Sequence, residues 1–202
     1  MIGVLAEEYC QEHRRIYDLG CSLGGATLAA VDRVSCQHFS TIAIDNSPAM
    51  IDRLRTKLED LPRFAKRIEC RCEDLIDAQL SNASVVILNF TLQFIPLAER
   101  VSLLSKIYAG MNPGGVLIIS EKITFPDEKL NQLFIEMYHG FKENMGYSKL
   151  EISQKRAALE KVLLPETLDI HRDRLQTIGF QSVDVWFQCF DFASMVAFKE
   201  AP

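Results

Sequence analysis

The sequence predicts an α/β fold in which a mainly parallel sheet is closed by an antiparallel hairpin. Short apolar runs alternate with segments of helical periodicity over residues 16–121, and strands that alternate with helices form βαβ units and a parallel sheet. Two β-rich runs then follow one another near the C-terminus, at residues 182–188 and 192–198. Their adjacency predicts the closing hairpin.

Length and composition are those of an ordinary globular domain. The chain has 202 residues, of which 48% are hydrophobic and 24% charged, which suits one domain with a substantial core. Its formal net charge is −5, whereas proteins with a general nucleic-acid patch are usually basic, so we expect no direct nucleic-acid partner. No apolar run approaches the ~20 residues that cross a bilayer. We therefore expect a cytoplasmic protein without a membrane partner.

The first residues have the character of an amphipathic helix. Residues 1–8 lack the basic region of a signal peptide. We therefore expect that a segment of the same domain precedes Met1.

The cysteines are scattered along the chain, and no two form a Cys-x-x-Cys pair. Cys70 and Cys72 would share one face of a strand, but no second pair and no nearby histidine complete a zinc-binding set. We therefore expect buried thiols of a reducing compartment and no metal. The cysteines are Cys10, Cys21, Cys36, Cys70, Cys72 and Cys189.

Parallel strands are expected where apolar runs are short and bounded by turn residues. A helix is expected from the glycine loop to Ala30, and another begins at Pro48 after a capping residue. The Asn-Pro-Gly-Gly run at 112–115 is expected to be a turn. The expected strands cover residues 16–19, 41–45, 68–72, 84–89 and 116–121, and the later helices cover 48–58, 97–111 and 171–178.

Residues 126–164 depart from this alternation. They are helical in pattern and rich in aromatic and charged residues, including Phe134, Tyr138, Phe141 and Tyr147. A two-helix cover packed on the sheet uses such residues, and so does a substrate lid or a dimer face. The pattern leaves both interpretations open.

Glycine or polar residues follow four of the expected strands. The loop at 20–25 follows the first strand and opens a helix, Asp45 ends the second, Asp74 follows the third and Asn89 ends the fourth. Small residues let a backbone approach a ligand closely, and a carboxylate one βαβ step later can accept hydrogen bonds from ribose hydroxyls. Because the carboxyl ends of parallel strands meet at one edge of a sheet, these positions predict a nucleotide site there.

Three enzyme classes place a glycine loop in this position. A dinucleotide dehydrogenase favours Gly-x-Gly-x-x-Gly, and here Ser22 replaces the glycine that admits the pyrophosphate. A serine hydrolase is considered because residues 20–24 fit Gly-x-Ser-x-Gly, but none of the later histidines (His38, His139 and His171) lies in a convincing strand-end loop. S-adenosylmethionine (SAM) has no pyrophosphate, so a serine is acceptable and can contact its methionine end. The pattern therefore favours SAM.

Several motifs together closely resemble those of the carboxy-S-adenosyl-L-methionine synthase family, and the resemblance spans nearly the whole chain. The strand-end motifs are general to the class I SAM methyltransferase fold, which is Rossmann-like, whereas the runs at Asn89, Glu151 and Trp186 are specific to the family. The fold implied has a helical cover inserted at about 126–164. The motifs are Tyr17-Asp-Leu-Gly-Cys-Ser-Leu-Gly, Ile44-Asp-Asn-Ser-Pro-Ala-Met, Asn89-Phe-Thr-Leu-Gln-Phe, Asn112-Pro-Gly-Gly, Glu151-Ile-Ser-Gln-Lys-Arg and Trp186-Phe-Gln-Cys-Phe.

The resemblance implies a particular reaction. Members of this family convert SAM and prephenate into carboxy-SAM and phenylpyruvate, without donating the SAM methyl group. The sulfonium acidifies that methyl group, so an ylide can capture the carbon dioxide released beside it. A tRNA carboxymethyltransferase then uses carboxy-SAM in the 5-oxyacetyl modification of the wobble uridine. The resemblance also implies a homodimer.

Site residues follow from the resemblance by motif. The product carboxylate needs a fixed cation, and the resemblance assigns this catalytic role to Arg156, which would otherwise be interpreted as an exposed helix residue. The family also has an N-terminal segment that brings a tyrosine to the SAM site, and this segment would precede Met1. The residues expected to hold the nucleoside and methionine parts are Gly20, Cys21, Ser22, Asp45, Asn46, Asp74, Leu75 and Asn89.

Two other functions remain open on the same fold. One is a SAM-dependent methyltransferase that acts on a small molecule or on tRNA, and the other is a non-catalytic SAM-binding protein. Carboxylated SAM released from the purified protein would favour the synthase, and SAM or its demethylated product would favour the methyltransferase.

Overall fold

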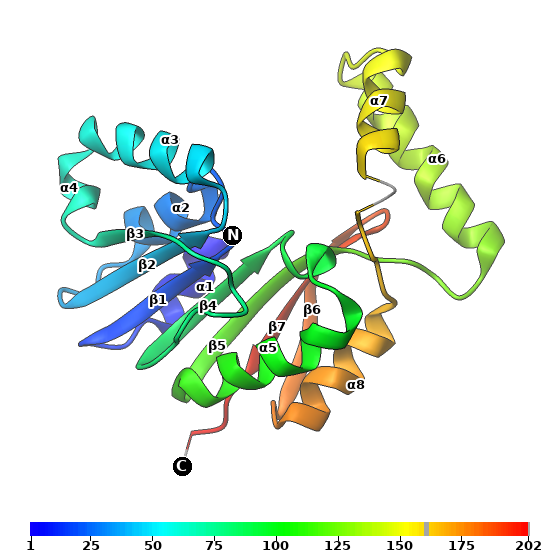
Figure 1. Ribbon diagram of the computed structural model, residues 1–202. Helices are drawn as coiled ribbons and strands as arrows, with labels where there is room; N and C mark the ends of the chain where they lie inside the picture. The colour runs from blue at the N-terminus through cyan, green and yellow to red at the C-terminus, as the bar shows by residue number, and fades with distance from the viewer. Residues whose placement is uncertain (160–161, 202) are drawn as a thin grey trace.

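The computed structural model describes residues 1–159 and 162–201 and places seven strands in one sheet of order β3-β2-β1-β4-β5-β7-β6 (Figure 1). Strands β1 to β5 pair in parallel, and β7 runs antiparallel to β5 and to β6. The predicted α/β fold, its parallel sheet and its closing hairpin are thereby confirmed. The strands are β1 (Arg14–Leu19), β2 (Phe39–Asp45), β3 (Ile68–Cys72), β4 (Ala83–Asn89), β5 (Met111–Lys122), β6 (Ser182–Cys189) and β7 (Phe192–Phe198).

Helices cover both faces of the sheet, because successive side chains of each buried strand point to opposite faces. In β1, Ile16 packs in the core cluster that includes residues of α1, α2 and α3, while Tyr17 and Leu19 pack in the cluster that includes residues of α5 and α8. The helices are α1 (Ile2–Tyr9), α2 (Gly25–Arg33), α3 (Pro48–Glu59), α4 (Pro62–Ala65), α5 (Leu97–Gly110), α6 (Glu128–Asn144), α7 (Lys149–Leu159) and α8 (Leu168–Ile178), with a 3-10 helix η1 (Leu92–Phe94).

The Asn-Pro-Gly-Gly run was expected to be a turn, but it lies within β5. Ala83 of β4 pairs with Met111, and two residues later Val85 pairs with Val116, so residues 112–115 form a bulge opposite β4. Gly114 supplies the positive φ of 74° that the bulge requires. Gly114 and Gly115 also exchange backbone hydrogen bonds with Lys199 beyond β7, which keeps this stretch extended. The partner strand, distant in sequence, therefore overrides the local turn preference.

Two helix starts differ from the expectation. Ser47 precedes α3 but makes no capping hydrogen bond with its side chain. Its amide instead donates to the Asp45 carboxylate (2.9 Å). Helix α8 begins at Leu168, three residues before the expected start, because the Thr167 hydroxyl accepts from the amide of Ile170 (3.3 Å).

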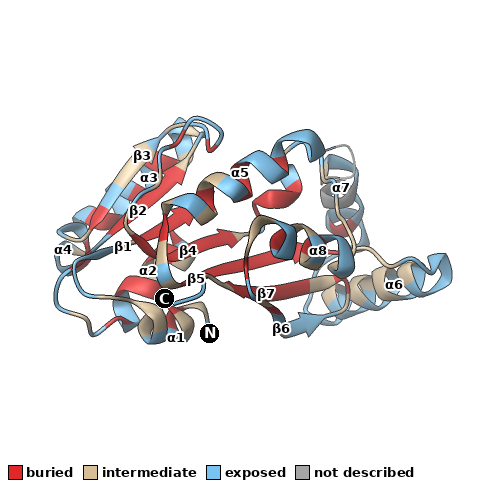
Figure 2. Cartoon of the chain, turned by 90° about the horizontal axis from the view of Figure 1, so that it is seen from below, coloured by how far each residue is buried: buried red, intermediate tan, exposed pale blue. Residues whose placement is uncertain are grey.

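Helices α6 and α7 form a pair that extends beyond the end of the sheet (Figure 1). Helix α6 has no buried residue, and Figure 2 shows it exposed or half-buried along its length. Its contact with the sheet is aromatic, with the Tyr138 ring 4.7 Å from that of Phe192 on β7. This exposure favours a lid or an interface over a cover packed on the sheet. None of the described helices is long and apolar enough to cross a membrane.

A buried arginine fixes the chain where it returns from this pair. Arg100 of α5 is fully buried, and its guanidinium donates to the Glu166 carboxylate and to the Leu164 carbonyl oxygen (2.8 Å), while its Nε donates to the Ile95 carbonyl oxygen (2.9 Å). Glu166 also pairs with Arg174 of α8. The guanidinium thus ties the loop after β4, helix α8 and the end of the helical pair together.

We predict that Glu166→Ala lowers the free energy of unfolding by about 3–5 kcal/mol, because Arg100 would keep a buried charge without its carboxylate. Urea unfolding followed by circular dichroism measures this. The matched control is Asp169→Ala, which removes an exposed partner of Arg172 and should cost at most about 1 kcal/mol. Equal losses in the two variants would contradict the anchoring role of Glu166.

Candidate functional site

The glycine loop after β1 touches the loop after β4. Gly20 has φ 79°, and a Cβ atom there would lie 2.4 Å from Oγ1 of Thr91, so only glycine fits. The amides of Gly20 and Cys21 both donate to the Ile44 carbonyl oxygen (2.8 and 2.9 Å) at the end of β2. The carboxyl ends of β1, β2 and β4 are therefore held together, as the sequence predicted for a nucleotide site.

Asp45 bridges two of these loops through its carboxylate. Oδ2 accepts from the amide of Ser22 (2.9 Å), and Oδ1 accepts from the amide of Ser47 (2.9 Å). Each carboxylate oxygen has a second lone pair, so the group keeps capacity for two further donors. A pair of vicinal hydroxyl groups, as in ribose, offers two such donors. Asn46, which follows, is exposed.

Asn89 ends β4, and the chain turns sharply directly after it. Phe90 has a positive φ of 59° and its amide donates to the Ser120 carbonyl oxygen (2.7 Å), while the Thr91 hydroxyl donates to the Asn89 carbonyl oxygen (3.4 Å). These bonds fix Asn89, which is half-buried, at the edge of the sheet beside the glycine loop. The Phe90 side chain is 42% exposed, so it offers an aromatic surface at this edge.

Glu121 of β5 holds the next turn and was not identified from the sequence. It is fully buried, and its carboxylate accepts from the amides of Thr91 (3.3 Å), Leu92 (2.8 Å) and Gln93 (3.0 Å) at the start of η1. Burial raises the pKa of Glu121 to about 8, and the three amide donors oppose that rise. The only sign of Glu121 in the sequence is an acidic residue at the end of an apolar strand, which indicates a buried carboxylate.

Asp74 and Leu75 lie in the loop that follows β3. The Asp74 carboxylate accepts from the amide of Ile76 (2.9 Å), which closes a turn. Leu75 is buried, and its carbonyl oxygen accepts from Nζ of Lys106 on α5 (3.0 Å). The sheet order puts this loop beside that of Asp45, since β3 is the neighbour of β2.

Asp18 lies beneath the glycine loop and was also missed. It is buried in β1 and accepts a hydrogen bond from the Thr27 hydroxyl of α2, while its Oδ1 has no partner among the described residues. Burial raises the pKa of Asp18 to about 6. Burial likewise raises the pKa of the Cys21 thiol, which makes that cysteine an unreactive packing residue.

The serine hydrolase alternative finds no support in this geometry. Ser22 has φ 48°, and its hydroxyl lies 3.7 Å from Sδ of Met50. His38 precedes β2 at the opposite edge of the sheet, and His171 is buried on α8. Burial lowers the pKa of His171 to about 4. Neither of these two histidines is placed to activate Ser22, and His139 lies on α6 in the helical pair that extends from the sheet.

Arg156 belongs to α7, in the helical pair that extends from the sheet. Its side chain lies outside the described residues, so the proposed contact with a ligand carboxylate stays a prediction. The other expected site residues lie in the four loops at the carboxyl edge of the sheet.

Comparison with known proteins shows which family the chain belongs to. A family described as "Methyltransferase domain" matches residues 16–115. A protein of Trichlorobacter lovleyi named carboxy-S-adenosyl-L-methionine synthase is 54% identical over 198 residues, which cover 98% of this chain and 81% of that protein. The chain belongs to the carboxy-S-adenosyl-L-methionine synthase family. Proteins of the same name from Aliivibrio fischeri (52% identical, covering 98% and 81%) and Salmonella paratyphi B (50%, covering 98% and 80%) agree with this.

Solved structures place this member of the synthase family among class I SAM methyltransferase folds. An O-methyltransferase family protein from Burkholderia thailandensis matches with a TM-score of 0.69 at 16% identity, covering 100% of this chain and 55% of that one. Human N-acetylserotonin methyltransferase, solved in complex with SAM, matches with a TM-score of 0.64 at 16% identity, covering 98% and 52%. At such identities the likeness shows the fold, and it confirms the predicted fold class.

We predict that Gly20→Ala lowers the free energy of unfolding by about 1–3 kcal/mol, because the new Cβ meets Thr91 and the backbone φ is positive. Thermal and urea unfolding measure the loss. Gly25→Ala is the matched control, since a Cβ there has no atom within 4 Å and φ is not positive. The close approach of the two loops is refuted if both variants unfold like the wild type.

Proposed function

We propose that this chain is a carboxy-SAM synthase, which converts SAM and prephenate into carboxy-SAM and phenylpyruvate. The observation that carries the proposal is the shared name of relatives at 50–54% identity over 98% of the chain. The bridging of two strand-end loops by Asp45 supports it, because such a carboxylate suits the ribose of SAM.

In this proposal the chain's residues bind and position SAM. Asp45 accepts the ribose hydroxyls, and the small residues Gly20, Cys21 and Ser22 let the loop approach the methionine part. Asn46, Asp74, Leu75 and Asn89 complete the nucleoside and methionine contacts from the neighbouring strand ends.

The proposed reaction balances as a carboxyl transfer coupled to aromatisation. Prephenate loses its ring carboxylate as carbon dioxide together with its ring hydroxyl group, and phenylpyruvate remains. The SAM methyl group loses one proton, which leaves with the hydroxyl group as water. The resulting carbanion, stabilised by the sulfonium, forms a carbon–carbon bond to the carbon dioxide. The product therefore carries a new carboxylate.

We infer that Arg156 binds this carboxylate. The planar fork of an arginine matches a carboxylate with two charge-assisted hydrogen bonds. A cation is unfavourable beside the sulfonium of SAM itself, so this interaction would distinguish product from substrate.

We further propose that the chain works as a cytoplasmic homodimer and that its product supplies a tRNA carboxymethyltransferase for wobble uridine modification. Support for an interface comes from the apolar residues exposed on the helical pair α6–α7. They include Leu133 (50% exposed), Phe141 (47%), Met145 (65%) and Leu150 (66%).

The second candidate is a SAM-dependent methyltransferase, which the matched methyltransferase domain and the structural neighbours favour. Product analysis separates the two. The purified chain, incubated with SAM and prephenate, should yield carboxy-SAM and phenylpyruvate by mass spectrometry. Methylated acceptor and demethylated SAM in place of these products would overturn the synthase proposal.

We predict that Asp45→Asn weakens SAM by roughly 1.5–3 kcal/mol, the scale of a hydrogen bond to a charged group. Asparagine keeps an acceptor oxygen for only one of the two loop amides, so urea unfolding of the variant is measured alongside to separate a loop effect from the loss of the ribose contact. Isothermal titration calorimetry measures the affinity, with Asp52→Asn on the exposed face of α3 as control. Unchanged affinity in Asp45→Asn would remove the ribose assignment.

We predict that Arg156→Ala leaves SAM binding largely intact but weakens carboxy-SAM at least tenfold, about 1.4 kcal/mol. Arg156→Lys should restore part of the affinity, because a point charge lacks the planar fork. Paired titrations of both ligands on the wild type and both variants provide the test. An equal loss for both ligands, or no loss for either, would exclude Arg156 as the carboxylate partner.

A further inference from the structure

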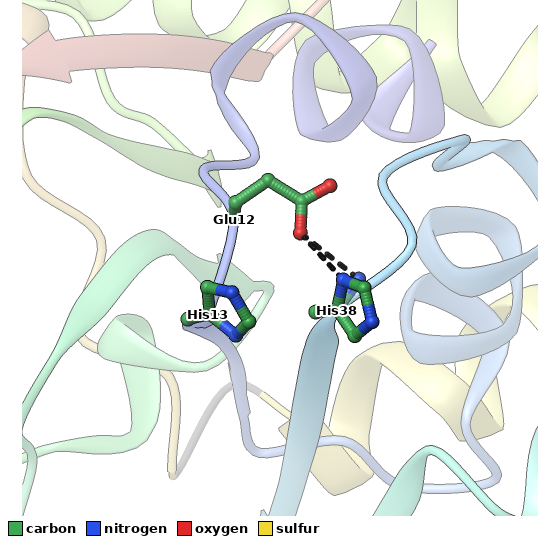
Figure 3. A group of neighbouring side chains, drawn as sticks. All are labelled: Glu12, His13 and His38. Atoms are coloured by element: carbon green, nitrogen blue, oxygen red, sulfur yellow. Dashed lines mark hydrogen bonds and ion pairs between the residues drawn. The ribbon is translucent and has the colours of Figure 1, made fainter.

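We infer that Glu12, His13 and His38 form a binding site for a divalent transition-metal ion such as Zn²⁺ (Figure 3). The three side chains each offer one ligand atom, and these atoms all lie within 4.8 Å of one another. Two imidazoles and a carboxylate are a donor set that suits zinc and its neighbours in the transition series. The cysteine spacing gave no such set, and these residues come together only in the fold.

The distance between the Glu12 and His38 ligand atoms fits a single small ion, and His13 lies close enough to join them after side-chain adjustment. Oε2 of Glu12 lies 3.2 Å from Nδ1 of His38, whereas two tetrahedral ligands at zinc bond lengths of about 2.0–2.1 Å are roughly 3.4 Å apart. The rings of His13 and His38 stack with centroids 5.0 Å apart and an angle of 21° between them. All three residues are exposed, so an ion has a direct path from solvent and water can complete its coordination.

The backbone already holds the three residues together before any ion binds. The amides of Gln37 and His38 both donate to the Glu12 carboxylate (3.1 Å each), and the amide of His13 donates to the His38 carbonyl oxygen (2.5 Å). Nδ2 of Asn82 donates to the His13 carbonyl oxygen (2.9 Å). His13 keeps a positive φ of 60°, which is uncommon outside glycine. The cluster therefore needs only side-chain adjustment to close around an ion.

The surroundings hold the Glu12 carboxylate in place as a ligand. Oε1 accepts from the amide of Gln37, and Oε2 accepts from the amide of His38. Contacts of this kind to a ligating side chain orient it and tune its affinity. Cys36 is half-buried on the same connector.

The position of the cluster points to a structural role. It joins the connector before β1 to the connector before β2, at the amino edge of the sheet, whereas Asp45 lies at the carboxyl edge. A strand the length of β1 separates the two edges by about 20 Å. A bound ion would therefore clip two connectors together and stabilise the folded chain, while SAM affinity stays the same.

Zinc titration of the metal-free full chain against a chromophoric chelator tests the proposal. We expect one Zn²⁺ per chain, with at least tenfold weaker binding in His38→Gln and in His13→Asn, since asparagine tolerates the positive φ. His139→Gln on α6 is the matched histidine control and should bind like the wild type. Zinc should raise the unfolding temperature of the wild type and the control but not of the two variants.

Cobalt substitution distinguishes this site from adventitious binding to the exposed thiols of Cys72 and Cys189. A histidine and carboxylate site gives weak visible bands without the thiolate charge-transfer band in the near ultraviolet. Equal zinc affinity in His38→Gln and the wild type would overturn the proposal. So would a thiolate charge-transfer band that persists in both variants at unchanged intensity.

Discussion

The structure depends on a row of four ionisable side chains, buried or half-buried, that lies beneath the carboxyl edge of the sheet. Arg100 is fully buried and pairs with Glu166, which also pairs with Arg174, while the Arg100 charge opposes the rise in pKa that burial causes in Glu121. A buried charge without a partner costs several kcal/mol, so each member of the row constrains its neighbours. The two ion pairs that Glu166 makes with Arg100 and Arg174 compensate the buried arginine charge and fix the elements that carry these three residues.

The geometry of the site follows from this row. Glu121 accepts three amides at the start of η1, which sets the position of Thr91. Thr91 in turn leaves room for Gly20 and for no larger residue. Gln93 adds to this arrangement, because its carbonyl oxygen accepts from the Leu164 amide (2.9 Å) and its Oε1 accepts from the Lys122 amide (3.0 Å). The loops that would meet SAM are therefore in place before a ligand arrives, which reduces the entropy lost on binding.

The sequence predicts the parts of this site that depend on local pattern. Asp45 and Asn89 end strands that their apolar runs make visible, and Gly20 follows such a strand, so their meeting at one edge follows from parallel pairing alone. Asp18 and Glu121 were missed, because an acid inside an apolar strand indicates burial without indicating its partner. The partners are hydroxyl and amide groups supplied by other segments.

Pairing between segments that are distant in sequence explains the other differences between the structure and the expectations from the sequence. The bulge at 112–115 is extended because Lys199, far along the chain, bonds to it. Glu12, His13 and His38 are individually ordinary surface residues, and only the parallel alignment of β1 and β2 brings their connectors together. In both cases the deciding contact lies outside any window of sequence that periodicity can analyse.

The charge at the carboxyl edge of the sheet is a further reason to expect that the cation for the product carboxylate lies on the helical pair α6–α7. The four loops at 20–25, 45–48, 73–78 and 89–97 contain several acidic residues and no lysine or arginine. Such an edge suits the positive sulfonium of SAM, but it is unfavourable for a product that carries a new carboxylate. A cation for that carboxylate must come from another segment. The α6–α7 pair extends from the sheet at the edge where β5 ends and β7 begins, which is the same edge as these loops (Figure 1). On the proposed function, the separation of the two charges into different segments lets the acidic loops bind substrate and lets Arg156 favour product.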